Sequence, residues 1–332
     1  MRHKMIKSKT SGEINDVETS KRKTLELMEI FNTPSVVLFK KTLFKDLLKI
    51  PKVFVSIFFM IIFPLIVILS ILVFTETYDG SLNDYLGLIY VYYTYCLIFP
   101  IILTAVGAPL IAEELKSGTM LTLISKPISR GEIIVTKYLA LTFFGLFINL
   151  VPLSLITLIA HTMQTFEGVE EFFVVSFLFS LVVQFFFQSI AFGFSCLVKK
   201  TRTAILMPLL IIIITFFVLM MFRSMFMYMY VGESEDPIYI QFQLYHFDLG
   251  YHLFNVYIGI MEITSGGVSE NMMFFLYMFG LYTQEVDYDT WEYSFSRNDF
   301  YSPLGSLIFI LLIVIGLMLL GYFLFKKRDI SR

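Results

Sequence analysis

Six separate apolar runs of about 20 residues each are the feature that most constrains how this chain can fold. A helix needs about 20 apolar residues to cross a hydrocarbon layer about 30 Å thick. The runs are almost free of Asp, Glu, Lys and Arg, and they lie at about residues 53–74, 86–112, 138–162, 172–198, 204–222 and 304–325. The sequence therefore predicts an all-α integral membrane protein with six transmembrane helices.

Composition supports a membrane protein. Hydrophobic residues make up 57% of the 332 residues and charged residues only 16%, against about 25% charged residues in an average soluble domain. A soluble fold of this size could not cover its apolar surface with so few charges. We therefore expect the lipid bilayer to surround the chain, and we expect no nucleic acid among its partners.

The positions of the basic residues predict the orientation in the membrane. With six spans, 23 of the 25 Lys and Arg residues fall on one side, and 17 of the 27 acidic residues fall on the other. Basic residues in short loops mark the cytoplasmic side. An odd number of spans would break this separation. We therefore predict a multi-pass protein of the cell (plasma) membrane with both termini in the cytoplasm.

The non-spanning stretches divide the chain into four predicted segments. Residues 1–52 form a cytoplasmic N-terminal segment, residues 53–222 hold the first five spans, residues 223–303 form a large extracytoplasmic loop or cap, and residues 304–332 hold the sixth span with a basic tail. The outer segment is too long for a simple connector. We expect it to form surface helices or a small cap, with the apolar run 272–282 interfacial or re-entrant.

Residues 36–50 fit an amphipathic helix just before the first span. One face of this helix would carry Val36, Phe39, Leu43, Leu47 and Ile50, and the opposite face Lys41, Lys45 and Lys49. A helix of this kind lies in the head-group layer with its lysines toward anionic lipid. The alternative is a helix packed on a protein partner.

The sequence lacks the common motifs for nucleotide binding and for zinc-dependent catalysis. The phosphate-binding pattern GxxxxGK[ST] and the zinc pattern HExxH are both absent, so the chain is not expected to bind ATP or Mg by itself and carries no predicted catalytic residue. The outer residues His246, Asp248 and His252 stand close together, but their spacing matches no standard set of metal ligands. An ordinary interfacial cluster is the preferred interpretation, and no metal is predicted.

The predicted spans contain no buried carboxylate or lysine, although such groups usually mark ion-driven transporters. The fourth span does carry a row of polar residues at helical spacing, which comprises Ser180, Gln184, Gln188 and Ser195. Hydrogen bonds between helices are one explanation for this row, at about 0.6 kcal/mol each. The other explanation is a substrate path or a dimer seam.

The loop between the second and third spans is the most informative segment, and we call residues 113–137 the elbow. Gly118 loosens the backbone there, and Pro127 disfavours helix at the residue before it. Ser129 and Glu132 have the S-x-x-E spacing of a capping box, which starts a new helix. The elbow should therefore be two short helical pieces around a break at the cytoplasmic surface, suited to docking a cytoplasmic partner.

The elbow, EELKSGTMLTLISKPISRGEIIVTK, closely resembles the signature loop of ATP-binding-cassette exporter permeases of the ABC-2 class. The closing residues FKKRDIS (325–331) are similar to the tail of that family, although Thr136 stands where many relatives have Gly. The resemblance assigns contact with the ATPase to Glu113, Glu114, Gly118, Thr119, Pro127, Ser129, Arg130, Glu132 and Lys137.

The resemblance implies a permease subunit, not an enzyme, that moves an unidentified substrate out of the cytoplasm or the inner leaflet. A separate cytoplasmic ABC ATPase subunit would bind ATP and Mg, and a second permease copy would complete a homodimer or heterodimer. Two alternatives stay open: a non-transport membrane scaffold, and a membrane-embedded enzyme with its site in the outer loop around His246, Asp248 and His252.

Overall fold

The computed structural model describes residues 33–74, 86–87, 90–125, 127–162, 168–229, 237–264, 268–287 and 292–327. The predicted N-terminal segment before residue 33, Lys126 of the elbow and the tail from residue 328 lie outside these ranges. Within them, six helices are long and apolar enough to cross a membrane, as the sequence predicts, and they run over Ile50–Ser70, Tyr90–Ser117, Arg130–Thr162, Val169–Leu197, Thr201–Met227 and Pro303–Lys327.

The spans differ in how regular they are. The first, third, fourth and sixth are the single helices α3 (Ile50–Phe74), α7 (Arg130–Thr162), α8 (Val169–Leu197) and α14 (Pro303–Lys327). The second is built from η3 (Tyr90–Ile98), α4 (Phe99–Gly107) and α5 (Pro109–Ser117), and the fifth from α9 (Thr201–Ile213), η4 (Ile214–Val218) and α10 (Leu219–Tyr228). Both η3 and η4 are π-helical.

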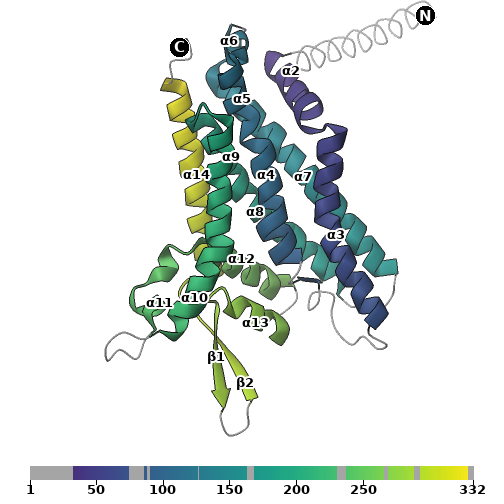
Figure 1. Ribbon diagram of the computed structural model, residues 1–332, viewed down its shortest axis with the longest axis vertical. Helices are drawn as coiled ribbons and strands as arrows, with labels where there is room; N and C mark the ends of the chain where they lie inside the picture. Colours follow the sequence, from purple (N-terminus) through teal and green to yellow (C-terminus); the bar gives the residue numbers. More distant parts are fainter. Residues whose placement is uncertain are drawn as a thin grey trace, which may run out of the picture.

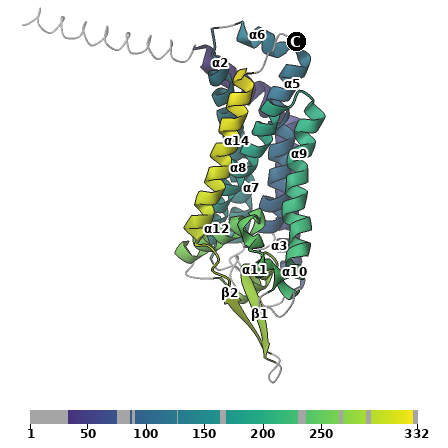
Figure 2. The same cartoon turned by 90° about the vertical axis from the view of Figure 1, so that its left-hand side faces the viewer.

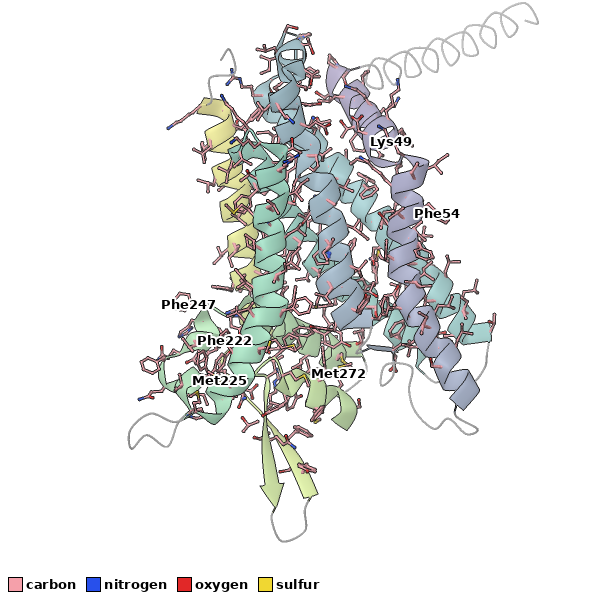
Figure 3. All side chains as sticks on the ribbon, viewed as in Figure 1. Lys49, Phe54, Phe222, Met225, Phe247 and Met272 are labelled. Atoms are coloured by element: carbon pink, nitrogen blue, oxygen red, sulfur yellow. The ribbon has the colours of Figure 1, made fainter. Side chains whose placement is uncertain are left out.

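Helix α8 is the centre of the bundle, where it contacts α4, α7, α9 and α14. In the most apolar stretch of α8, 61% of the residues are buried, compared with 22% in α3 and 17% in α14. The peripheral helices expose large apolar side chains, among them Phe54 on α3 and Leu312 on α14, and Figure 3 shows Phe54 pointing away from the bundle. Apolar side chains on the outside of a helix bundle are stable in lipid and not in water.

Both ends of the described chain lie at the same end of the bundle, as an even number of spans requires (Figures 1 and 2). We call this the terminal end. Helix α2 (Pro34–Lys40), α5, α6 (Thr119–Ile124) and the last turn of α14 gather there, whereas α10 and the described residues between 237 and 297 occupy the opposite end.

The amphipathic helix is present but differs from the prediction. Helix α2 continues into the π-helix η1 (Lys41–Leu47), and both pack on α7 of the same chain. Leu43 and Leu47 are buried as expected, while Ile50 is 84% exposed and begins α3. The prediction for Ile50 is therefore wrong, because η1 ends at Leu47 and Ile50 lies beyond the amphipathic helix, in α3.

The segment from 237 to 297 folds into a small layer at the opposite end, built from α11 (Ile238–Gln241), η5 (Leu244–His246), α12 (Leu249–Thr264), α13 (Glu270–Tyr277) and the strands β1 (Tyr282–Asp287) and β2 (Glu292–Arg297). Helix α12 is buried under the bundle against α8 and α14. The strands pair antiparallel from Tyr282↔Arg297 to Asp287↔Glu292 and extend away from the bundle (Figure 2). The hairpin is not predicted from the sequence, which indicates only surface helices or a small cap in this segment.

Two predictions about charged residues are wrong. Arg223, expected in the outer loop, belongs to α10 and is 2% exposed. Lys137 on α7 is 1% exposed and pairs with Glu114 on α5, so the helices do contain a buried lysine. In both cases the helix extends beyond the apolar run, and the charged side chain turns into the protein, where it pairs with an acidic residue.

Candidate functional site

The elbow has the predicted architecture of two helical pieces around a break. Helix α5 ends at Ser117, Gly118 takes the left-handed backbone conformation with φ +75°, and α6 follows at once. The Ser117 and Thr119 hydroxyls hydrogen-bond across the break at 2.9 Å. Glycine adopts a positive φ without steric cost, so Gly118 allows the chain to turn sharply between two helices.

The predicted capping box is formed in both directions. The Ser129 backbone N–H donates to Glu132 Oε2 at 3.0 Å, and the Glu132 backbone N–H donates to Ser129 Oγ at 3.2 Å. These bonds satisfy two amides that the first turn of a helix leaves without partners. They fix the start of α7 next to α6.

The start of α7 is also tied to the end of α14. Arg130 Nη1 donates to the Lys326 carbonyl at 3.0 Å. Gly131 lies so close to Tyr322 that a Cβ atom there would stand 3.2 Å from the ring. The elbow is thereby linked to the last span, 196 residues further along the chain.

Helix α5 is held by a serine where its backbone is interrupted. Pro109 follows a turn at Ala108, and Ser195 Oγ on α8 accepts hydrogen bonds from the backbone N–H groups of Ile111 at 2.9 Å and Ala112 at 3.1 Å. A proline inside a helix displaces the carbonyls of the preceding turn. Ser195 therefore replaces acceptors that the helix cannot supply and couples α5 to the central helix α8.

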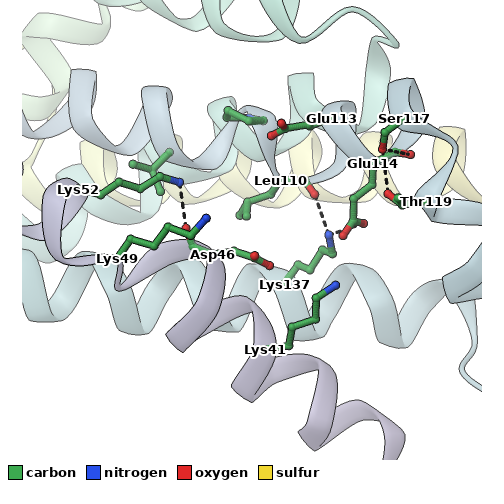
Figure 4. A pocket seen from close by; sticks show the side chains of 12 residues that line it. Lys41, Asp46, Lys49, Lys52, Leu110, Glu113, Glu114, Ser117, Thr119 and Lys137 are labelled. Atoms are coloured by element: carbon green, nitrogen blue, oxygen red, sulfur yellow. Dashed lines mark hydrogen bonds and ion pairs between the residues drawn. The ribbon is translucent and has the colours of Figure 1, made fainter.

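Lys137 joins α5 to α7 (Figure 4). Its ammonium group lies 2.5 Å from Glu114 Oε2 and donates to the Leu110 carbonyl at 2.7 Å. A buried ammonium requires both a counter-charge and hydrogen-bond acceptors, and α5 supplies both. The sequence assigned Glu114 and Lys137 to the elbow but did not pair them.

The outer surface of the elbow is exposed and partly apolar. Leu121 on α6 is 51% exposed and its neighbour Met120 is buried, and Glu113, Thr119 and Pro127 elsewhere in the elbow are also exposed. A protruding apolar side chain surrounded by polar groups is typical of a protein–protein contact.

A charged cavity of about 320 Å³ lies behind the elbow (Figure 4). One wall comes from η1 and the start of α3, and the other from α4, α5 and α7. Its lining residues are Lys41, Asp46, Lys49, Lys52, Val106, Pro109, Leu110, Glu113, Glu114, Ser117, Thr119 and Lys137. Small-molecule sites in proteins have volumes of about 300–1,000 Å³, so the cavity is large enough for a ligand.

The polar row of α8 is fully buried within this chain, at Ser180, Gln184, Gln188 and Ser195. Asn149 on α7 donates to Ser180 Oγ at 2.6 Å. Gln184 and Gln188 both donate to Thr142 on α7, at 2.9 Å to its carbonyl and 2.6 Å to its hydroxyl. This geometry is that of hydrogen bonding between helices. A role of the row in a substrate path or a dimer seam stays a prediction.

His246, Asp248 and His252, which lie at the end opposite the termini, have separate side-chain partners. Asp248 binds Arg223, His246 Nδ1 hydrogen-bonds the Tyr301 hydroxyl at 2.5 Å, and His252 Nδ1 lies 3.0 Å from Ser306 Oγ. Burial lowers the pKa of His252. Among the described residues, no group of three His, Cys, Asp or Glu could hold a metal ion.

The pairing of Arg223 with Asp248 is not predicted from the sequence, where Asp248 is grouped with His246 and His252. Both guanidinium contacts, Nε to Oδ2 and Nη2 to Oδ1, measure 2.5 Å, and Tyr239 donates to the same carboxylate at 2.9 Å. One signal was available, since Arg223 is one of only two basic residues on the acid-rich side. A lone arginine next to an apolar run needs a buried acidic partner when its helix packs inside the protein.

Comparison with known proteins agrees with this architecture. A comparison with curated proteins finds no relative that matches the chain. The model of the family described as ABC-2 family transporter protein matches residues 38–330, which include α2 from Leu38 onward, the elbow and all six spans. The chain therefore belongs to the ABC-2 transporter family and is a multi-pass membrane permease subunit of an ABC transporter.

Proposed function

We propose that this permease exports its substrate from the cytoplasm or the inner leaflet, driven by a separate ABC ATPase that docks on the elbow. The terminal end is then cytoplasmic and the layer of α11–α13 with its hairpin extracytoplasmic. Of the 25 Lys and Arg residues, 23 fall on the terminal side, which agrees with the cytoplasmic excess of basic residues in membrane proteins.

The observation that carries the proposal is the set of bonds that leave the elbow. Ser195 ties α5 to α8, Lys137 ties α5 to α7, and Arg130 ties α7 to α14. A ligand shifts a conformational equilibrium only through different affinities for the two states. A docked ATPase that prefers one position of α6 would bias the arrangement of three spans through these bonds.

A second permease subunit completes the proposed transporter, as a homodimer or a heterodimer with a related chain. The large apolar side chains exposed on α3, α9, α10 and α14 offer surface for such a partner as well as for lipid. The substrate is unidentified. The two alternatives, a membrane scaffold and an enzyme with its site in the outer loop, differ from this proposal because neither requires an ATPase at the elbow.

The elbow can be tested with single substitutions at exposed positions. Glu113→Lys and Leu121→Asp should abolish co-purification of an ABC ATPase chain from native membranes, identified by mass spectrometry. Glu114→Lys is a poorer choice, because Glu114 forms a buried pair with Lys137. Tyr293→Asp, an exposed site on the hairpin at the opposite end, is the matched control. Retention of the ATPase by both elbow variants would contradict the proposal.

Orientation needs its own experiment. Ser125 in the elbow and Ser294 in the hairpin are both exposed, and Cys96 and Cys196 are buried. In intact cells, a membrane-impermeant maleimide should label Ser294→Cys and should label Ser125→Cys only after the membrane is opened. The reverse pattern would place the elbow outside the cell and remove it from any contact with a cytoplasmic ATPase.

A further inference from the structure

The cavity behind the elbow is lined by charges of both signs that the fold leaves unpaired. Apart from the Lys137–Glu114 pair, Lys41, Lys49 and Lys52 face it together with Asp46 and Glu113. Within the described part of the chain, none of these five side chains forms an ion pair. Lys52 instead donates to the Asp46 backbone carbonyl at 2.9 Å. Charged side chains that have no partner of opposite charge attract a ligand that supplies one.

The cavity lies beside the start of the first candidate membrane span. Lys49 immediately precedes Ile50, the first residue of the first span, and Lys52 stands in the first turn of that span. Val106, Pro109 and Leu110 add apolar surface to the lining. Charged groups together with apolar surface match a molecule with a polar head and an apolar body.

We propose that this cavity binds the head group of a phosphatidylethanolamine molecule of the adjacent leaflet. The phosphate would lie against Lys41 and Lys49, and the primary ammonium group against the carboxylates of Asp46 and Glu113. A purely anionic head group would satisfy the lysines and repel both carboxylates. A zwitterion with hydrogen-bond donors on its cationic end satisfies both.

A head group bound in the cavity would also join two parts of the fold. The two walls belong to η1 and the start of α3 on one side, and to α5 of the elbow on the other. A bound head group would link the amphipathic helix to the elbow through charge-assisted hydrogen bonds, which are about twice as strong as neutral ones. The elbow would then respond to the lipid composition of its own leaflet.

The test measures lipid binding to the purified full-length protein by native mass spectrometry, with phosphatidylethanolamine, phosphatidylcholine and phosphatidylglycerol titrated in turn. Phosphatidylethanolamine should bind most tightly. The double variant Lys41→Gln, Lys49→Gln should weaken this binding at least about tenfold, the equivalent of about 1.4 kcal/mol. Lys45→Gln is the matched control, because Lys45 is exposed on the same helix η1 but does not line the cavity.

Asp46→Asn tests the other end of the head group. It should weaken the binding of phosphatidylethanolamine and leave that of phosphatidylglycerol unchanged or stronger, since the ammonium alone loses its partner. Equal binding of the three lipids, or equal effects of the lysine variants and Lys45→Gln, would overturn the proposal. Competition by inorganic phosphate at the same concentration would also overturn it, by assigning the lysines to a soluble ion. None of these measurements depends on an ATPase, so they fail or succeed separately from the proposed function.

Discussion

The buried ion pair of Arg223 and Asp248 should be the most sensitive point of the layer opposite the termini. The two side chains are 1% and 5% exposed. Arg223 also donates to the Met278 carbonyl at 3.0 Å, and Gly280, with φ +71°, packs on its side chain. Asp248→Asn keeps the shape of the carboxylate, removes its charge and leaves the buried guanidinium without a counter-ion.

The size of the effect follows from this geometry. Removing one partner of a buried ion pair costs about 3–5 kcal/mol, because the other charge stays buried. Each kcal/mol shifts the thermal midpoint of a chain of 150–250 residues by about 2–4 °C, and by less in longer chains. At about 2 °C per kcal/mol, Asp248→Asn should lower the midpoint by about 6–10 °C.

The assay is thermal unfolding of the purified protein in one detergent, with all variants heated at the same rate. Arg297→Met is the control, since Arg297 is only partly buried and pairs with the exposed carboxylates of Glu262 and Asp299; ion pairs of this kind contribute about 0–1 kcal/mol. The double variant Arg223→Met, Asp248→Leu should lower the thermal midpoint less than Asp248→Asn does, because it leaves no buried charge unpaired. If Asp248→Asn shifts the midpoint no more than Arg297→Met does, the assignment of this pair as a structural anchor is wrong.

Three further results are expected from the same unfolding assay. Ser195→Ala should lower the free energy of unfolding by about 1–3 kcal/mol, because two buried backbone amides of α5 lose their acceptor. Ser294→Ala, at an exposed site, is the control and should leave the free energy of unfolding unchanged. Gly259→Ala should destabilise the protein by about 1–3 kcal/mol, since its Cβ would stand 2.4 Å from Pro303, whereas Gly316→Ala has open space and should be neutral. Burial lowers the pKa of His252, so the unfolded chain binds more protons below about pH 6.5 and the stability of the protein falls from pH 7 to pH 5. The stability of the His252→Gln variant should fall less over that range. If the variant has the same pH dependence as the original protein, this prediction is wrong.

The elbow shows how far a local pattern can be followed. The S-x-x-E spacing of Ser129 and Glu132 predicts the capping box that the structure contains, because both bonds join residues three apart. The break at Gly118 is equally local, since only the backbone of one residue decides it. The Lys137–Glu114 bond joins residues 23 positions apart on two different helices. No periodicity in either helix specifies that contact.

The sequence by itself determined the number of spans and their separation from the charged segments. Both follow from the transfer of apolar and charged side chains between water and lipid, which depends on composition along the chain and not on what each residue touches. It also determined where the elbow begins to turn, since glycine conformation and helix capping act within a few residues.

Only the tertiary structure decided which charges are buried and which groups share a cavity. Arg223 looked like a loop residue because it follows an apolar run, but Asp248, 25 residues later, lets it remain inside. Lys41, Lys45 and Lys49 looked like one lipid-facing row, but the fold sets Lys41 on η1 and Lys49 just before α3 in the same cavity as Glu113. The free energy of a charge depends on its neighbours in space, and those neighbours come from parts of the chain that the sequence does not bring together.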